Sequence, residues 1–247
     1  MDHKLEPELQ AKVNNSVAVL KKAHDEYGEV TFANSFGAED MVITDLIRCF
    51  VPEIEIFSLD TGRLPEETLV LLAKVEARYK FKVNVYYPAA ASVEAYVRDN
   101  GINGFFESQA LRKGCCYVRK VEPLQRALSG KKAWVTGIRR EQAVTRDGVE
   151  FNEWDDGNQL HKINPLADWT EKEVWAFIET FDLPYNALHD QHYPSIGCAP
   201  CTRAISVGED VRAGRWWWED PDAKECGLHP ASSGLTPPVE EPLKDPA

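Results

Sequence analysis

The sequence of 247 residues lacks any apolar run of the roughly 20 residues that a membrane-spanning helix needs. Its first residues also lack the basic and then apolar layout of a secretory leader. Positive charge is scarce, because 28 Lys and Arg stand against 40 Asp and Glu, a formal net charge of -12. Such an acidic chain is poorly suited to bind a polyanion. We therefore expect a cytoplasmic protein whose partner is neither a membrane nor a nucleic acid.

Cysteine is also rare, and its six copies are unevenly placed. Cys115 and Cys116 are adjacent, and Cys198 and Cys201 form a Cys-x-x-Cys pair much further along the chain. In a reducing compartment, such pairs are more typical of a metal site than of structural disulfides. Zinc would require two adjacent thiolates on one tetrahedron, whereas a [4Fe-4S] cluster offers them separate iron corners. The pattern therefore favours a cluster over zinc, and either over a redox-active dithiol.

The two remaining cysteines are expected to differ in role. Cys49 lies in the apolar stretch 46–50, which predicts an ordinary buried thiol. Cys226 would be surplus to a site that four sulfurs already fill, so it is free to act as a nucleophile. A neighbouring cation would lower the pKa of such a thiol, and His229 is a candidate for that cation.

The spacing of apolar residues predicts alternating strands and helices, and hence an α/β fold with a parallel sheet between two helical layers. Strands are expected over 30–34, 54–59, 83–87 and 133–136, and helices over 5–27, 41–50, 65–79, 92–100, 107–128 and 170–181. Residues 154–158 read as a turn. Residues 1–229 are expected to form a single domain that ends in an arm of about 219–229. The Pro-, Ser- and Glu-rich stretch 230–247 predicts a disordered tail.

Ligands of parallel sheets bind at the carboxyl ends of the strands, where loops present free backbone N–H groups. The loops 35–40, 60–63 and 137–140 are expected to meet there. Arginine forks suit phosphate and sulfate, and Arg139, Arg140, Arg212 and Arg215 are candidates, the last two three positions apart on a predicted helical turn. The first two loops could also be tight turns that merely close strands.

Several strings occur together and in a characteristic order. They are SLDTGR at 58–63, CCYVRK at 115–120, TGIRR at 136–140, CAPCTR at 198–203, RAGRWWW at 212–218 and ECGLH at 225–229. Over roughly residues 30–229 the chain resembles the assimilatory adenylylsulfate reductases, the iron-sulfur branch of the phosphoadenylylsulfate reductase family. Each string is weak alone, but the set is specific.

The resemblance implies thiol-dependent reduction of adenylylsulfate to sulfite and AMP on a fold of the ATP pyrophosphatase, or adenine nucleotide hydrolase-like, group. It implies that Cys226 attacks the sulfate sulfur and becomes a cysteine S-sulfonate, from which thioredoxin or a similar thiol donor releases sulfite. It also assigns a [4Fe-4S] cluster to Cys115, Cys116, Cys198 and Cys201. The substrate-binding residues that it implies are Ser35, Phe36, Gly37, Ser58, Leu59, Lys120, Gly137, Arg139, Arg140, Arg212, Arg215 and His229. Homo-oligomer formation stays open.

Other functions compete with this one. Family members that use phosphoadenylylsulfate usually lack the four cluster cysteines, although dual use stays open. An ATP-dependent sulfur transferase on the same fold, such as one that thiolates tRNA, is a second class. The loop 35–40 lacks the second Gly and the final Ser of the pyrophosphatase string Ser-Gly-Gly-x-Asp-Ser, which disfavours ATP. A third class is a non-enzymatic iron-sulfur sensor or a structural zinc protein, indifferent to loss of Cys226.

Some residues are given plainer interpretations. Arg119 and Arg203 read as solvated surface charges. His161, His189 and His192 read as hydrogen-bonded scaffold rather than as ligands of a second metal. The run Trp216–Trp218 is either core or a docking face for the thiol donor, and the sequence favours neither.

Overall fold

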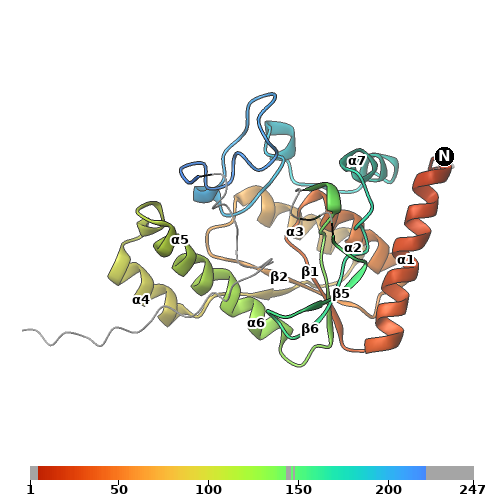
Figure 1. Cartoon of the computed structure of the whole chain (residues 1–247), viewed down its shortest axis with the longest axis horizontal. Coiled ribbons are helices and arrows are strands. Elements are labelled where there is room, and N and C mark those ends of the chain that lie inside the picture. Colours follow the sequence, from red (N-terminus) through yellow and green to blue (C-terminus); the bar gives the residue numbers. More distant parts are fainter. Residues whose placement is uncertain (1–4, 143–145, 147, 221–247) are drawn as a thin grey trace, which may run out of the picture.

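The computed structural model describes residues 5–142, 146 and 148–220 (Figure 1). Its strands are β1 Val30–Ala33, β2 Glu55–Leu59, β3 Asn84–Tyr86, β4 Ala133–Val135, β5 Asn152–Asp155 and β6 Leu160–Ile163. Its α-helices are α1 Pro7–Tyr27, α2 Ala38–Phe50, α3 Glu66–Tyr79, α4 Ala90–Asn100, α5 Gln109–Cys116, α6 Glu122–Leu128 and α7 Glu171–Thr180. Five residues, Tyr117–Val121, form a π-helix, η2, between α5 and α6.

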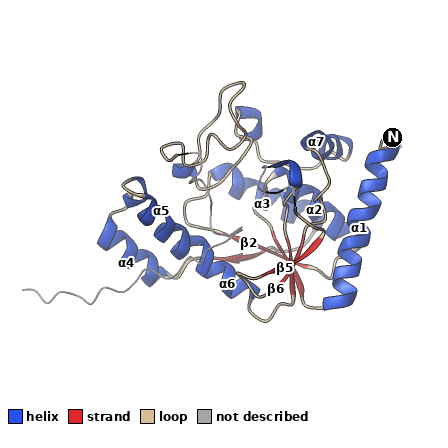
Figure 2. Ribbon diagram, viewed as in Figure 1, coloured by secondary structure: helices blue, strands red, loops and turns tan. Residues whose placement is uncertain are grey.

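The strands form one mixed sheet in the order β3-β2-β1-β4-β6-β5 (Figure 2). Every neighbouring pair is parallel except β5 with β6, which is antiparallel. In the centre, Phe32 is in register with Ile56 on one side and with Val135 on the other. Because β1, β2 and β4 run the same way, the loops that follow them open at one edge of the sheet.

Two apolar layers fix the helices on the sheet. On one face, α1, α2 and α7 pack together over the buried side chains of the central strands, with Leu46 of α2 fully buried. On the other face, α6 contributes Leu124 and Leu128, which pack against Phe57 and Trp134. The α4 and α5 helices extend beyond the sheet on the side of β3 (Figure 1). The predicted three-layer α/β fold is confirmed.

Three details differ from the sequence prediction. Residues 154–158 were expected to be only a turn, but Trp154 and Asp155 belong to β5, which pairs with β6 in a hairpin. The hairpin was missed because its strands are short and half-polar, so their apolar alternation is weak. The helix expected over 107–128 begins at Gln109 and is interrupted by η2. Pro65 caps α3 rather than opening its first turn.

Cys49 also differs from its prediction. It lies exposed on α2 and is not a buried thiol, because the apolar stripe of that helix faces Leu46 and Ile47 inward. Within the described part of the chain, the helices are too short or too polar to cross a membrane.

Replacing Leu46 by alanine should lower the free energy of unfolding by about 2–5 kcal/mol, because its fully buried side chain would leave a cavity between helix and sheet. Val70→Ala on α3, where 46% of the residue is exposed, should cost less than about 1 kcal/mol. Urea denaturation followed by circular dichroism measures both. Equal losses in the two variants would contradict the assigned core.

Candidate functional site

A cavity of about 650 Å³ opens at the carboxyl ends of the strands. Residues at the ends of β1, β2 and β4 line it, including Ser58 within β2 and Ser35 and Gly137 in the loops that follow β1 and β4. The segment that carries Cys198 and Cys201 also forms part of its wall, with residues 194–197, 205–208, 211, 212 and 215. The three loops that the sequence placed at this edge therefore do meet.

Most of the predicted substrate-binding residues reach this cavity, and two do not. Those that line it are Ser35, Gly37, Ser58, Leu59, Lys120, Gly137, Arg139, Arg212 and Arg215. Phe36 instead turns its side chain into an apolar cluster with Met41 and Leu71, and it does so from a left-handed backbone, with φ of 62°. Arg140 donates to the Val149 carbonyl at 2.8 Å and is outside the lining.

The loop after β1 is organised around Asp40. The backbone N–H and the hydroxyl of Ser35 both donate to Asp40 Oδ2, at 2.6 and 2.7 Å. A Cβ at position 137 would overlap Asp40 Oδ1, so glycine is required there for close packing of the two loops. Burial raises the pKa of the Asp40 carboxyl to about 7, although the hydrogen bonds from Ser35 act to lower this pKa. The donors that a phosphate loop would offer to a ligand are thus satisfied by the protein itself.

The next wall of the cavity carries a buried ion pair. Arg139 is 5% exposed and donates to Glu39 and Glu141, at 2.8 and 3.0 Å for the closest atoms. The Gln142 side chain also donates to Glu39, at 2.9 Å. Of the two tandem arginines, Arg139 is therefore the one at the cavity, and its charge is already balanced by carboxylates.

A second part of the lining is cationic, and we call it the cationic end of the cavity. Lys120, Arg212 and Arg215 line it together. Arg215 is buried at 7% exposure, and its Nη1 donates to Ser195 Oγ and to the Ile196 carbonyl, both at 3.3 Å. The two arginines lie on a turn in which Arg215 N donates to Arg212 O at 2.9 Å, rather than on a regular helix. This end suits the anionic part of a ligand.

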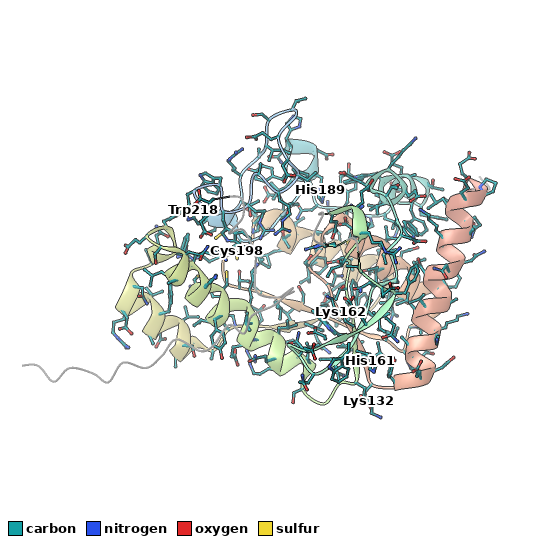
Figure 3. All side chains as sticks on the ribbon, viewed as in Figure 1. Lys132, His161, Lys162, His189, Cys198 and Trp218 are labelled. Carbon is teal, nitrogen blue, oxygen red and sulfur yellow. The ribbon has the colours of Figure 1, made fainter. Side chains whose placement is uncertain are left out.

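The paired cysteines lie beside this cationic end. Cys115 and Cys198 pack against the cluster formed by Cys201, Phe105 and Trp216. Burial raises the pKa of the Cys201 thiol to about 12, the charges of Cys198 and Cys115 add to the rise, and Lys120 and Arg215 oppose it. Burial, followed by the charges of Cys115 and Cys116, likewise raises the pKa of Tyr96 to about 12. The fold thus brings the two distant pairs into one lobe, and Figure 3 shows Cys198 near Trp218.

The sequence analysis missed the groups that surround these thiols. Arg119 was expected at the surface but is buried, donates to the Thr61 carbonyl at 2.7 Å, and opposes the burial that raises the pKa of Cys115. Its position four residues after Cys115 on a helix was a usable signal. Thr61 Oγ1 lies 3.3 Å from Cys198 Sγ. Arg203 is part-exposed and pairs with Glu209, as a surface charge would.

The histidines separate into two groups. His161 lies on β6 away from the cavity, where its Nδ1 hydrogen-bonds Asn152 at 3.1 Å. His189 and His192 line the cavity. The His189 Nε2 atom is buried with no hydrogen-bond partner among the described residues, and burial lowers the pKa of this imidazole. His189 is therefore an uncharged residue in the cavity wall. From the sequence, it was predicted only to be a hydrogen-bonded structural residue.

Among the residues that the structure describes, no group of three or more His, Cys, Asp or Glu side chains is arranged to hold a metal ion. Two buried indole N–H groups, of Trp216 and Trp218, have no acceptor within the same part of the chain. Cys226, His229 and the predicted tail 230–247 lie outside the described residues.

Comparisons with known proteins place this cavity in context. Residues 29–204 match the family described as phosphoadenosine phosphosulfate reductase domain. The adenosine 5'-phosphosulfate reductase of Allochromatium vinosum is 57% identical over 214 residues, which are 87% of this chain and 84% of the relative. That of Burkholderia cepacia is 53% identical over 225 residues, 91% of this chain and 90% of the relative.

Solved structures agree on the fold. The phosphoadenylyl-sulfate reductase of Candida auris superposes with a TM-score of 0.67 at 28% identity, covering 82% of this chain and 98% of its own. The FMN adenylyltransferase of Candida glabrata gives a TM-score of 0.58 at 14% identity, covering 93% and 82%. The second likeness concerns the fold alone.

Asp40 gives a pH-dependent test of the site. Since burial raises its pKa from 3.8 to about 7, the folded protein binds this proton more tightly than the unfolded chain does. The contribution of Asp40 to stability is therefore full below pH 3.8 and declines as the pH rises toward 7. Asn cannot ionise, so the free energy of unfolding of Asp40→Asn should rise relative to that of the parent as the pH increases from 3.8 to about 7. Above pH 7 the difference should stay constant. Urea titrations at a series of pH values measure the difference.

Asp25→Asn, on the exposed side of α1, serves as the control, because its carboxyl stays in water in both states. A stability difference for Asp40→Asn that does not change with pH would show that the Asp40 carboxyl is not held in its buried, uncharged form.

Proposed function

Because the chain belongs to the phosphoadenosine phosphosulfate reductase family, we propose that it is an enzyme that reduces adenosine 5'-phosphosulfate to sulfite and AMP in sulfate assimilation. Its relatives of that name match almost the whole of the chain. The observation that carries the proposal is the cationic end of the cavity, where Lys120, Arg212 and Arg215 lie next to the paired cysteines. A ligand with an adenylate at one end and a sulfate at the other matches this polarity.

The adenylate is proposed to lie over the strand ends. Ser58 and Leu59 of β2 and the loop of Ser35 and Gly37 offer backbone groups to adenine and ribose. The phosphate and sulfate then lie toward Lys120 and the two arginines, whose charges offset the repulsion that an incoming thiolate would meet. Arg139, paired with Glu39, shapes the wall rather than neutralising the substrate.

The reaction is proposed to proceed in two thiol steps. The Cys226 thiolate attacks the sulfate sulfur, an S–S bond forms, and the S–O bond to AMP breaks with its electron pair leaving on the phosphate oxygen. A thiolate of the donor then attacks Cys226 Sγ, so that sulfite leaves with the S–S electron pair. A second donor thiol resolves the mixed disulfide and frees Cys226. Two thiols are oxidised to one disulfide, and the sulfur takes up the two electrons.

A [4Fe-4S] cluster is proposed on Cys115, Cys116, Cys198 and Cys201. The lobe fits such a group in three respects: the thiols are close enough to shift each other's pKa, Thr61 and Arg119 face them, and two buried indole N–H donors lack acceptors within the described part. A single tetrahedral ion fits less well, because Cys115 and Cys116 are adjacent and would have to place two sulfurs on one tetrahedron. When bound, the cluster would supply a fixed charge centre beside the sulfate group of the substrate.

The remaining partners are proposed from the same chemistry. Turnover needs a dithiol donor of the thioredoxin kind, and a reducing cytoplasmic setting keeps both that donor and Cys226 as thiols. Of the three tryptophans, Trp216 is core, whereas Trp217 is 40% exposed and could contact a donor.

The competing functions are weakened by the loop after β1. Asp40 occupies the place of the final Ser in the pyrophosphatase string, and its carboxylate takes the Ser35 donors that would otherwise hold a pyrophosphate. An ATP-dependent sulfur transfer is therefore disfavoured. Phosphoadenylylsulfate remains a second substrate candidate, since the Candida auris enzyme that shares this fold is named for it.

The nucleophile is tested by incubating anaerobically purified protein with adenosine 5'-phosphosulfate and measuring intact mass. A sulfonate adduct is expected on the parent chain and on Cys49→Ser, whose exposed thiol lies on α2. Cys226→Ser should give no adduct and no sulfite. An adduct that persists in Cys226→Ser would remove Cys226 from the mechanism.

The role of Arg215 can be tested without replacing it. A Cβ at Gly197 would overlap the Arg215 guanidinium, so Gly197→Ala should displace this flexible end from the cavity. Loss of a charge-assisted hydrogen bond should weaken binding of adenosine 5'-phosphosulfate by about 10- to 100-fold while the unfolding midpoint changes little. Equilibrium dialysis measures the affinity. Gly148→Ala, where a Cβ meets open space, is the control, and equal affinity in the two variants would contradict a role for Arg215.

A further inference from the structure

The most deeply buried ion pair of the described residues joins α5 to the segment that ends the described chain. Arg112 Nε donates to Glu219 Oε1 at 2.9 Å, and its Nη2 donates to Oε2 at 2.6 Å. The two side chains are only 1% and 7% exposed. The geometry is therefore bidentate and largely shielded from water.

Stability alone does not account for such a pair. Removing two charges from water costs about as much free energy as their attraction returns, so an apolar pair of similar volume would hold the protein together equally well. A bidentate fork does offer something that apolar contacts lack, which is a fixed direction and distance between two backbone segments. The question is which segments this pair holds in place.

The pair connects the two halves of the cysteine quartet. Arg112 lies one helical turn before Cys115 on α5. Its guanidinium carbon also lies 4.6 Å from the ring centroid of Trp216, whose backbone N–H donates to the Cys201 carbonyl at 3.1 Å. Glu219 N donates in turn to the Trp216 carbonyl at 2.9 Å. One guanidinium thus bridges the helix of the first cysteine pair and the turn segment next to the second.

A backbone feature supports the same interpretation. Trp216 is held with φ of 40°, a left-handed conformation that is strained for a bulky residue. Its ring is 1% exposed and has Arg215 near it as well, 4.8 Å from the centroid. Two cations and a buried pocket keep the residue in that conformation. The segment is therefore held in one arrangement against α5.

We propose that Arg112 and Glu219 are positioning residues that set the separation of the two cysteine pairs, and thereby the retention of the cluster that the quartet holds. This inference rests on the proposed function only in so far as that function places a cluster on these four cysteines. It does not involve Cys226, the substrate or the thiol donor.

The experiment compares cluster retention with folding stability in the full-length protein. The double variant Arg112→Met/Glu219→Met removes both charges, so it leaves no unpaired buried ion and should unfold in urea at a midpoint near that of the parent. After anaerobic purification, iron per chain and the charge-transfer absorbance of the cluster are followed during exposure to air. Loss of the cluster should be about 10- to 100-fold faster than in the parent, the usual effect of removing a supporting group around a metal site.

The chain provides a matched control. Arg203 and Glu209 form another bidentate pair in the loop after Cys201, with both bonds at 3.0 Å, but their side chains are 37% and 34% exposed. Arg203→Met/Glu209→Met should therefore leave the rate of cluster loss unchanged. Arg112→Lys, which keeps the charge but not the fork, should fall between the parent and the double variant.

The outcomes separate this inference from the proposed function. If the parent holds iron and Arg112→Met/Glu219→Met loses it no faster, the pair is structural only and the inference is wrong. If cluster loss accelerates only in proportion to a lowered urea midpoint, the inference is likewise wrong. If the parent binds no iron at all, the cluster proposal itself fails, and the adduct on Cys226 can still be tested.

Discussion

The structure of the site depends on one constraint, which is that a buried guanidinium group must remain hydrogen-bonded. Four arginines are buried among the described residues, Arg112, Arg119, Arg139 and Arg215. A charge removed from water is tolerated only when it is paired or hydrogen-bonded. Each of the four therefore binds groups far away in the sequence, and together they fasten the cysteine lobe and the C-terminal segment to the edge of the sheet.

The charge at the cationic end of the cavity has the opposite sign to the net charge of the whole chain. The whole chain has a net charge of -12, whereas Lys120, Arg212 and Arg215 all line one cavity. In the poorly hydrated interior these cations act strongly on anions nearby, so they can hold a phosphate, a sulfate and thiolates at the same place. Arg139, already neutralised by Glu39 and Glu141, contributes shape instead of charge. The cavity therefore has a wall whose arginine is paired with carboxylates, in addition to its cationic end.

The loop of Ser35 and Asp40 illustrates how a fold is adapted to a different ligand. A helix N-terminus with free donors would bind phosphate groups. Here a buried carboxylate takes the donors, and Gly137 allows the neighbouring loop to close against it. The cavity at the strand ends is kept, while the donors that would wrap a pyrophosphate are taken by the protein itself.

Much of the site could be predicted from the sequence because strand ends in a parallel sheet must converge. The strings around Ser58 and Gly137 were placed correctly at one edge for that reason. Lys120, which the resemblance alone assigned to the site, also lines the cavity. The positions of Phe36 and Arg140 were not predictable, since a single backbone dihedral or a neighbouring carbonyl decided where each side chain points. The β5–β6 hairpin was missed because its apolar alternation is weak.

The sequence by itself determined the alternating α/β layout and the family, because these depend on residue type, order and period. Only the tertiary structure decided which charges are buried. Arg112 finds Glu219, and Arg119 finds Thr61, through contacts between segments that have no relation in sequence spacing. Burial is a property of the packed chain, and no local pattern encodes which distant group will satisfy a particular guanidinium.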